Sequence, residues 1–313
     1  MVDNVDMRIA VVGTGAMGSV YAGLLADAGN EVWAVDVWRE HIEAIKEKGL
    51  RVEGASGDRR VWMKATTIPS EIGLVDLVII ATKTSHVQSA AESIRTLVGN
   101  HTTVLTIQNG LGSGETVTTI LGQGKVILGV AGGFGASIKA PGHVHHNGWE
   151  FVHMGEPHGP ATPRVHQVAE IWRRAGFKVT AQDDLKRLIW EKLICNVCYS
   201  GICAVLECTI GEVITDCNAW KVGSTCAVEA FQVALRSGVH LSFKDPIQHV
   251  QVFGRKIPKA RPSVLLDLMA GRPTEIGEIN GAIPRAASLY DYSAPYNEVI
   301  TALVKNKEKQ SKL

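Results

Sequence analysis

A short apolar run near the start of the chain leads directly into a glycine-rich turn, and this unit constrains the fold most. The run ends at Val12 and is followed by Gly13-Thr14-Gly15-Ala16-Met17-Gly18, a G-x-G-x-x-G pattern. Apolar residues then recur at helical spacing from Met17 to Ala28, and a second apolar strand, Val32 to Val35, ends in Asp36. The glycine pattern alone is weak, because a glycine-rich turn can bind nothing. Strand, glycines, helix, strand and acid in this order indicate a dinucleotide-binding unit.

The glycines of such a unit have separate mechanical roles. Gly13 permits the tight turn, Gly15 lets the backbone approach a pyrophosphate, and Gly18 lets the helix pack close to the strand. The free N–H groups at the start of the helix face the phosphates. We therefore expect the whole turn, with Thr14, Ala16 and Met17, to bind the cofactor.

Asp36 bears on the choice of cofactor. A carboxylate at the end of the second strand accepts hydrogen bonds from both hydroxyls of an adenosine ribose and repels a 2′-phosphate. A site for NADP usually offers a cation there, but here Val37 follows and the nearest cation is Arg39. Asp36 can also be the N-cap of the following helix, and the two roles are compatible. The sequence favours NADH.

Composition and charge exclude several classes of partner. The 313 residues suffice for two domains, and 32 Lys and Arg against 31 Asp and Glu create no field toward nucleic acid or an anionic membrane. Residues 1–6 lack the order of a secretion signal. The longest apolar segment, Leu193 to Leu206, is interrupted by polar residues and is too short to span a bilayer. We expect a soluble cytoplasmic protein.

Two clusters of side chains, one of cysteines and one of histidines, could in principle bind a metal ion. All six cysteines lie between Cys195 and Cys226, and they include a C-x-x-C pair. The segment is predicted helical with cysteines at core positions, and no second pair follows at zinc-finger distance, so we expect buried thiols. A histidine cluster lies in a strand-like region, where alternation places two of its members on one face and a third on the other, against a compact site. Its members are His143, His145, His146 and His153. We expect no metal.

Downstream of Asp36, apolar strands alternate with helices, which predicts a doubly wound parallel sheet. Residues 126–155 are strand-like and glycine-rich, as expected for antiparallel additions at the edge of that sheet. Beyond Asp184 the strand signals vanish and helical spacing dominates. We predict a dinucleotide-binding domain over residues 1–183 and an all-helical substrate and catalytic domain over residues 184–313. The expected elements of the first domain are a helix ending at Gly49, a hairpin over 50–66, a central strand over 75–81, a helix over 86–98, a strand over 102–107, a helix over 163–175 and a strand over 177–180.

Lys83 and Asn109 each follow a predicted strand. Ligands of open α/β sheets bind outside the carboxyl ends of the strands, so both residues are expected where a nicotinamide or its substrate would lie. A surface lysine and a turn-forming asparagine are the ordinary alternatives.

Lys192 begins a row of polar residues on an otherwise apolar helix. Lys192, Asn196 and Ser200 are spaced at i, i+4 and i+8, so they lie along one face. A lysine in such a place either extends its ammonium to solvent or is held in a cleft. The helix alone does not decide between the two.

Residues 261–281 form a second segment rich in polar side chains. The helix after Ser263 is expected to end at Gly271, and a new helix is expected to begin next, because Pro273 and Glu275 suit a first turn.

Together these features resemble the ketopantoate reductase family (2-dehydropantoate 2-reductases), over essentially the whole chain. The resemblance rests on the glycine turn, Lys83, Gln108-Asn109-Gly110, the helix from Lys192 to Asn196, and the series Ser263, Asp267, Glu275 and Asn280-Gly281. The last two blocks are specific to the family, whereas the glycine turn is not. The resemblance implies a Rossmann-type N-terminal domain and a helical C-terminal domain like that of 6-phosphogluconate dehydrogenase.

The resemblance also implies roles for the matching residues. Lys192 would be the general acid, and Glu275 would orient and support it and contact the cofactor. Ser263, Asn109 and Asn196 would hold the 2-oxo acid, with Asn109 also reaching the cofactor. These residue types suit the chemistry, because hydride transfer to a ketone leaves negative charge on its oxygen, which a positioned ammonium stabilises and protonates.

Two positions depart from the family pattern. The family usually has a second asparagine where this chain has Ser200, which bears on the substrate's hydroxyl end. Its most familiar members use NADPH, with a basic residue where this chain has Asp36-Val37.

We therefore expect reduction of 2-dehydropantoate to (R)-pantoate, on the route to pantothenate and coenzyme A, by NADH or NADPH with NADH favoured. A paralogous reductase of another branched 2-oxo acid is one alternative. A dinucleotide sensor without turnover is another, but it would have no reason to keep Lys192 and Glu275 in the family's register. A homodimer is compatible with the helical half.

Overall fold

The computed structural model describes residues 7–133, 135–148 and 151–310, and the chain divides into two compact units. The first unit takes the described residues up to Gln108 and those from Ser113 to Leu185. The second takes Asn109–Gly112 and the residues from Lys186 onward. A short loop from the first half of the sequence thus belongs with the helical unit.

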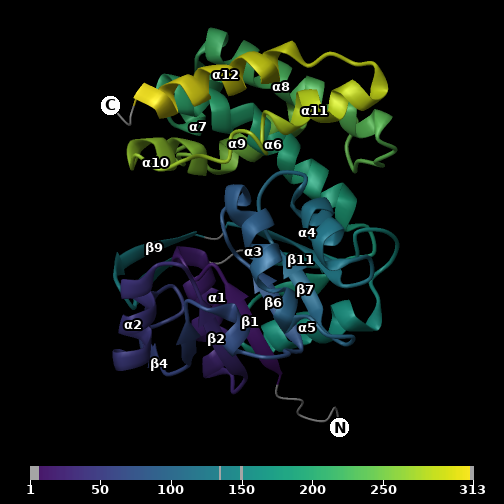
Figure 1. Ribbon diagram of the computed structural model, residues 1–313. Helices are drawn as coiled ribbons and strands as arrows, with labels where there is room; N and C mark the ends of the chain where they lie inside the picture. Colours follow the sequence, from purple (N-terminus) through teal and green to yellow (C-terminus); the bar gives the residue numbers. More distant parts are fainter. Residues whose placement is uncertain (1–6, 134, 149–150, 311–313) are drawn as a thin grey trace. The chain divides into compact units, whose positions relative to one another are not determined.

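In the described part of the first unit, the main sheet has eight strands in the order β12-β11-β8-β7-β6-β1-β2-β5. All neighbouring strands are parallel except β8 and β11. The strands are β1 (Arg8–Val12), β2 (Glu31–Val35), β5 (Lys64–Thr66), β6 (Leu77–Ile80), β7 (Thr103–Thr106), β8 (Val126–Gly132), β11 (Phe151–Gly155) and β12 (Val179–Ala181). Helices cover both faces of this sheet (Figure 1). They are α1 (Ala16–Asp27), α2 (Arg39–Lys48), α3 (Val87–Ser93), α4 (Ser113–Leu121) and α5 (Pro163–Arg174), with short 3-10 turns η1 (Pro69–Glu71), η2 (Thr84–His86) and η3 (Arg95–Leu97).

The two faces of the sheet carry separate apolar cores. Ile9 and Val11 of β1 pack into one core together with α1 and α5, while Ala10 and Val12 pack into the other with α3. A strand buried on both faces requires consecutive apolar residues rather than alternation. The predicted doubly wound sheet is therefore confirmed.

A second, four-stranded sheet in the order β4-β3-β10-β9 lies beside α1. Its strands are β3 (Leu50–Gly54), β4 (Arg59–Val61), β9 (Gly135–Ala140) and β10 (His143–Gly148). The hairpin predicted over 50–66 is confirmed for β3 and β4, which pair antiparallel, whereas residues 64–66 form β5 of the main sheet. The expectation for residues 126–155 was partly wrong. β8 runs parallel to β7, and β10 leaves the main sheet to pair with β3; only β11 is an antiparallel addition beside β8.

Two element boundaries also differ from the prediction. The helix expected over 86–98 ends at Ser93 and continues only as the 3-10 turn η3. The last strand begins at Val179 rather than at Phe177, which is instead buried against Tyr21 and Trp172. Aromatic packing therefore replaces strand pairing at Phe177.

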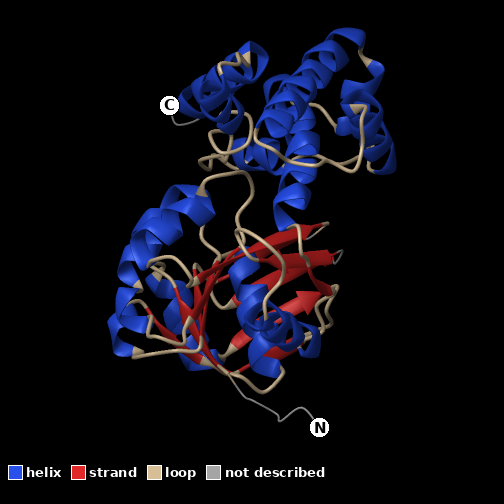
Figure 2. Cartoon of the chain, turned by 90° about the vertical axis from the view of Figure 1, so that its right-hand side faces the viewer, coloured by secondary structure: helices blue, strands red, loops and turns tan. Residues whose placement is uncertain are grey.

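The second unit is helical, as predicted (Figure 2), and α6 is the longest of its described helices. Its helices are α6 (Leu185–Leu206), α7 (Ile210–Thr215), α8 (Cys217–Arg236), α9 (Pro246–Lys256), α10 (Ser263–Met269), α11 (Ala282–Ala287) and α12 (Pro295–Gln310), with the 3-10 turn η4 (Ser288–Tyr290). At 22 residues, α6 is long and apolar enough to cross a membrane, contrary to the shorter segment expected. About two-thirds (67%) of its most apolar 18-residue stretch is buried inside the protein, with Leu193, Ile194 and Val197 in the core, which is the packing of a core helix.

The cysteine prediction holds for four of the six thiols. Cys195, Cys198, Cys203 and Cys226 are buried, whereas Cys208 is half-buried. Cys217, the first residue of α8, is exposed. Burial raises the pKa of Cys195 to about 12, so this thiol stays protonated at neutral pH.

Candidate functional site

The glycine turn connects β1 to α1, and its glycines meet different surroundings. Gly13 has φ of +90°, and a Cβ on it would lie 2.6 Å from the backbone nitrogen of Thr82. A Cβ on Gly18 would lie 2.0 Å from the carbonyl oxygen of Gly13, so the helix could not approach the turn with any other residue. A Cβ on Gly15 would meet no atom within 4 Å. Gly13 and Gly18 thus serve close packing, while Gly15 borders open space.

The residues present fit a dinucleotide pyrophosphate. Gly15 is the N-cap of α1 and supplies no side-chain cap to the helix. The first N–H groups of a helix have no intrahelical acceptor, and together with the helix dipole they attract a phosphate. The buried Thr14 hydroxyl also has no hydrogen-bond partner among the described residues. Ala16 and Met17 form the first turn of α1.

Asp36 immediately follows β2, as expected, and is half-buried. Its Oδ1 accepts a hydrogen bond from the Trp38 N–H at 3.0 Å. The N-cap interpretation of Asp36 was wrong, because α2 begins at Arg39 with Trp38 as its N-cap. The next residue, Val37, is uncharged and 93% exposed, so no positive charge follows the carboxylate directly in sequence.

Lys83 lies three residues beyond β6, and its backbone is the N-cap of η2. Its side chain is exposed. The ends of β6 and β7 are tied together by Gln108, whose Nε2 donates to the carbonyls of Ile80 at 2.7 Å and Thr82 at 3.2 Å. Sequence analysis did not assign this role to Gln108, and a polar residue just after a strand carries no signal that would distinguish it.

Within the second unit, three predicted residues lie together. The Lys192 Nζ on α6 donates to the Asn109 Oδ1 at 2.8 Å. The Asn109 Nδ2 donates to the Glu275 Oε2 at 3.2 Å. The two ends of one amide therefore bridge an ammonium and a carboxylate, with the acceptor toward the cation and the donor toward the anion.

The loop that carries Asn109 is held by the segment that carries Glu275. The Leu111 N–H donates to the Glu278 carbonyl at 3.2 Å, and Gly110, with φ of +84°, lets the two backbones touch. A Cβ on Gly110 would lie 2.1 Å from that carbonyl oxygen, so no other residue fits. This contact explains why Asn109 belongs to the helical unit.

The segment around Glu275 is not the helix that was expected. After α10 ends at Met269, residues 270–281 form successive turns, and α11 begins only at Ala282. Glu275 is buried, and its carbonyl accepts from the N–H groups of Glu278 and Ile279. Asn280, which sequence analysis grouped with the site, is fully buried and donates to the carbonyl of Val197 at 2.9 Å. Asn280 thus fastens the turns to α6 rather than facing a ligand.

Burial controls the electrostatics of Lys192. It lowers the pKa of Lys192 to about 8, and the attraction of the Glu275 carboxylate opposes part of that change. The ammonium is therefore mostly charged at pH 7, yet it releases its proton more readily than an ordinary lysine.

The remaining predicted residues lie on two helices of the same unit. Asn196 and Ser200 follow Lys192 on α6 at one and two turns, where Asn196 is half-buried and Ser200 is buried. Ser263 is the exposed first residue of α10.

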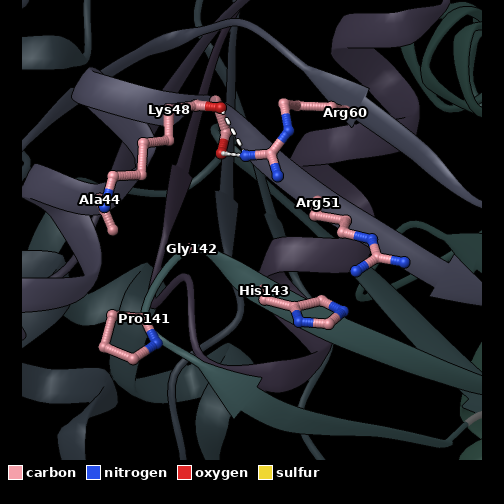
Figure 3. A pocket seen from close by; sticks show the side chains of 8 residues that line it. Ala44, Lys48, Arg51, Arg60, Pro141, Gly142 and His143 are labelled. Carbon is pink, nitrogen blue, oxygen red and sulfur yellow. Dashed lines mark hydrogen bonds between the residues drawn. The ribbon is translucent and has the colours of Figure 1, made fainter.

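Two other features of the first unit involve histidines. On β10, His143 and His145 both contact Glu53, at 3.1 and 3.3 Å, while His146 is buried, which confirms the predicted alternation. A small pocket lies where the end of α2 meets β3 and the turn before β10 (Figure 3). It is lined by Ala44, Lys48, Gly49, Arg51, Arg60, Pro141, Gly142 and His143.

A doubly wound sheet with this glycine turn, an acid after β2 and a separate helical unit with a half-buried lysine defines the class of dinucleotide-dependent dehydrogenases and reductases. Residues 9–159 match the family model described as ketopantoate reductase PanE/ApbA, and residues 184–308 match its C-terminal model. The chain belongs to the ketopantoate reductase family. It is an oxidoreductase that uses a nicotinamide cofactor.

Relatives in sequence and in structure agree with this assignment. The 2-dehydropantoate 2-reductase of Pyrococcus horikoshii is 33% identical over 306 residues, covering 96% of this chain and 98% of the relative. The crystal structure of a ketopantoate reductase from Ralstonia eutropha has a TM-score of 0.89 at 31% identity, covering 98% and 100% of the two chains. A D-mandelate dehydrogenase solved with NADH and anilino(oxo)acetate also has a TM-score of 0.89, at 28% identity and with the same coverage.

Proposed function

We propose that the enzyme reduces 2-dehydropantoate to (R)-pantoate, in the cytoplasm and on the route to pantothenate and coenzyme A, with Lys192 as the general acid. The observation that carries the proposal is the bridge in which Asn109 joins the Lys192 ammonium to the Glu275 carboxylate, at 2.8 and 3.2 Å. The bridge holds the Lys192 ammonium on α6, an otherwise apolar helix that also carries the polar residues Asn196 and Ser200.

The reduced nicotinamide supplies the hydride when it is bound. Lys192 then has two tasks. Its ammonium stabilises the negative charge that develops on the carbonyl oxygen, and it transfers a proton from Nζ to that oxygen. A pKa of about 8 suits both tasks, because the group is charged at neutral pH and close enough to its pKa to give up the proton.

Asn109 and Glu275 act on Lys192 as positioning residues. The amide oxygen of Asn109 fixes the direction of the ammonium, and Glu275 fixes the amide by accepting from its nitrogen. The carboxylate also favours the charged form of the lysine. We place Asn196, Ser200 and Ser263 in contact with the 2-oxo acid, with Ser200 at the position that departs from the family pattern.

We propose that the cofactor binds to the glycine turn from Gly13 to Gly18 and to Asp36, with Lys83, Asn109 and Glu275 toward the nicotinamide end. The open space at Gly15 and the uncapped start of α1 support the first part. Asp36 with the exposed Val37 favours NADH over NADPH, since a carboxylate repels a 2′-phosphate.

A different 2-oxo acid is the alternative substrate, and the structural likeness to a D-mandelate dehydrogenase supports this alternative. The test is steady-state reduction of 2-dehydropantoate, phenylglyoxylate and several aliphatic 2-oxo acids by the purified enzyme, with NADH and NADPH in parallel. We expect the highest kcat/KM for 2-dehydropantoate with NADH. A higher value for phenylglyoxylate would favour the alternative, and no turnover of any 2-oxo acid would contradict the reductase proposal.

A further inference from the structure

A buried histidine behind the glycine turn has no part in the reaction described above. His41 on α2 is fully buried and stacks on Trp38, with ring centroids 4.9 Å apart and planes inclined by 14°. Its Nδ1 accepts a hydrogen bond from the Gly142 N–H at 3.0 Å, and its Nε2 lies 3.1 Å from the Ser19 Oγ. Because a backbone N–H can only donate, Nδ1 carries no hydrogen, and in the neutral ring the hydrogen is on Nε2.

Ser19 extends this arrangement to the glycine turn. Ser19 lies on α1, is fully buried, and donates from its Oγ to the Thr14 carbonyl at 2.7 Å. Its hydroxyl therefore accepts from the His41 Nε2–H. The hydrogen bonds run in one direction, from the Gly142 N–H through His41 and Ser19 to the Thr14 carbonyl.

The direction of the Thr14 carbonyl determines the direction of the Gly15 N–H. The Thr14 carbonyl and the Gly15 N–H belong to one planar trans peptide, so they point in opposite directions. Since Ser19 holds the carbonyl toward the protein interior, the Gly15 N–H is turned away from it. Gly15 itself borders open space.

We propose that Ser19 and His41 are positioning residues for the dinucleotide, which orient the peptide between Thr14 and Gly15 so that the Gly15 N–H donates to the cofactor pyrophosphate. This inference rests on the proposal that the glycine turn holds the cofactor. It adds a requirement for neutral His41, since a proton on Nδ1 would face the Gly142 N–H. Burial lowers the pKa of His41 against the opposing attraction of the Asp36 carboxylate, which favours the neutral ring.

The test is direct titration of the free enzyme with NADH and NADPH, followed by cofactor fluorescence, without any 2-oxo acid. In Ser19→Ala we expect the Kd of the preferred dinucleotide to rise about tenfold, which corresponds to about 1.4 kcal/mol. At saturating dinucleotide, kcat should stay within about twofold of the wild type, because the reacting groups are unchanged. If Ser19→Ala folds poorly, Ser19→Cys replaces it in this test, because it keeps the size of the side chain. We expect the same rise in Kd for this variant.

Two further variants separate positioning from general stability. His41→Gln can still accept from Gly142 and donate to Ser19, so it should retain most of the affinity, whereas His41→Leu should lose about as much as Ser19→Ala. Ser224→Ala is the matched control, because it removes a buried hydroxyl of α8 that donates to the Lys221 carbonyl of the same helix. It should leave the Kd unchanged.

Two outcomes would overturn the inference. If wild-type enzyme binds dinucleotide and Ser19→Ala and His41→Leu bind it equally well, the two residues only support the fold. If wild-type enzyme binds neither dinucleotide, the assignment of the glycine turn fails and this inference fails with it.

Discussion

At the scale of single residues, the proposed chemistry depends most on the pKa of Lys192. Burial lowers that pKa to about 8, and the Glu275 carboxylate opposes the change. A general acid must be protonated, so kcat for reduction should be level near neutral pH and fall about tenfold per pH unit well above pH 8. The measurement is kcat at saturating substrates from about pH 6 to about pH 10.

The variant Glu275→Gln tests the direction in which the pKa of Lys192 shifts. Removing the carboxylate removes the attraction that favours the charged lysine, so the pKa of Lys192 should fall and the basic limb should move to lower pH. A limb that moves to higher pH, or a kcat that rises through pH 8, would show that Lys192 does not act as the acid.

Asp36 carries the prediction for cofactor choice. If its carboxylate accepts from the ribose hydroxyls, Asp36→Ala should lower kcat/KM for NADH at least about tenfold, the loss expected for one hydrogen bond to a charged group. The same change should raise the relative use of NADPH. Glu40→Ala removes an exposed acid from the first turn of α2 and is the control. A wild-type preference for NADPH would contradict our interpretation of Asp36.

At the scale of elements, Asn280 connects the turns around Glu275 to the core of the helical unit. Its Nδ2 donates to the Val197 carbonyl and to the Asn297 Oδ1, both at 2.9 Å, and Asn297 in turn donates to the buried Glu229. Asn280→Ala removes the donor to the buried Asn297 Oδ1 and the side-chain donor to the Val197 carbonyl, so it should lower the free energy of unfolding by about 2–3 kcal/mol. Urea unfolding would measure it, with the exposed Asn218→Ala as the control. Equal stability of the two variants would refute the role of Asn280.

The elements that the sequence predicted well are those with a single clear period. Buried strands such as β1 and β6 are continuous apolar runs, and α1 and α6 have apolar residues at helical spacing, so their types followed from local pattern. The pairing of β10 with β3 joins His143 to Arg51, far apart in the chain, and no local pattern records it. The turns after α10 resembled a helix start because Pro273 and Glu275 suit one. In the structure these residues form turns instead, and their backbone contacts the Asn109 loop at Glu278.

The sequence predicted which residues belong to the candidate site, but it did not predict which of them hydrogen-bond to one another. Lys192, Asn109 and Glu275 were proposed from their match to the family. That Asn109 lies between the other two depends on the contact of Gly110 with Glu278. His41 and Ser19 gave no signal, since a buried histidine in an amphipathic helix has the spacing of an ordinary core residue.

At the scale of the whole molecule, the proposed chemistry is divided between two units. The glycine turn and Asp36 belong to the first unit, and Lys192 and Glu275 belong to the second, together with the loop Asn109–Gly112. A change to the lysine should therefore alter the chemical step without altering how the first unit binds the dinucleotide.

The most direct test of the account is kcat for reduction of 2-dehydropantoate by wild type and by Lys192→Ala, each at saturating dinucleotide. We predict that Lys192→Ala loses at least about a hundredfold in kcat, as expected for a general acid, while its dinucleotide Kd stays at the wild-type value. Lys186→Ala, which removes an exposed lysine from the same helix, should keep wild-type kcat. A Lys192→Ala enzyme with undiminished kcat would contradict the central claim.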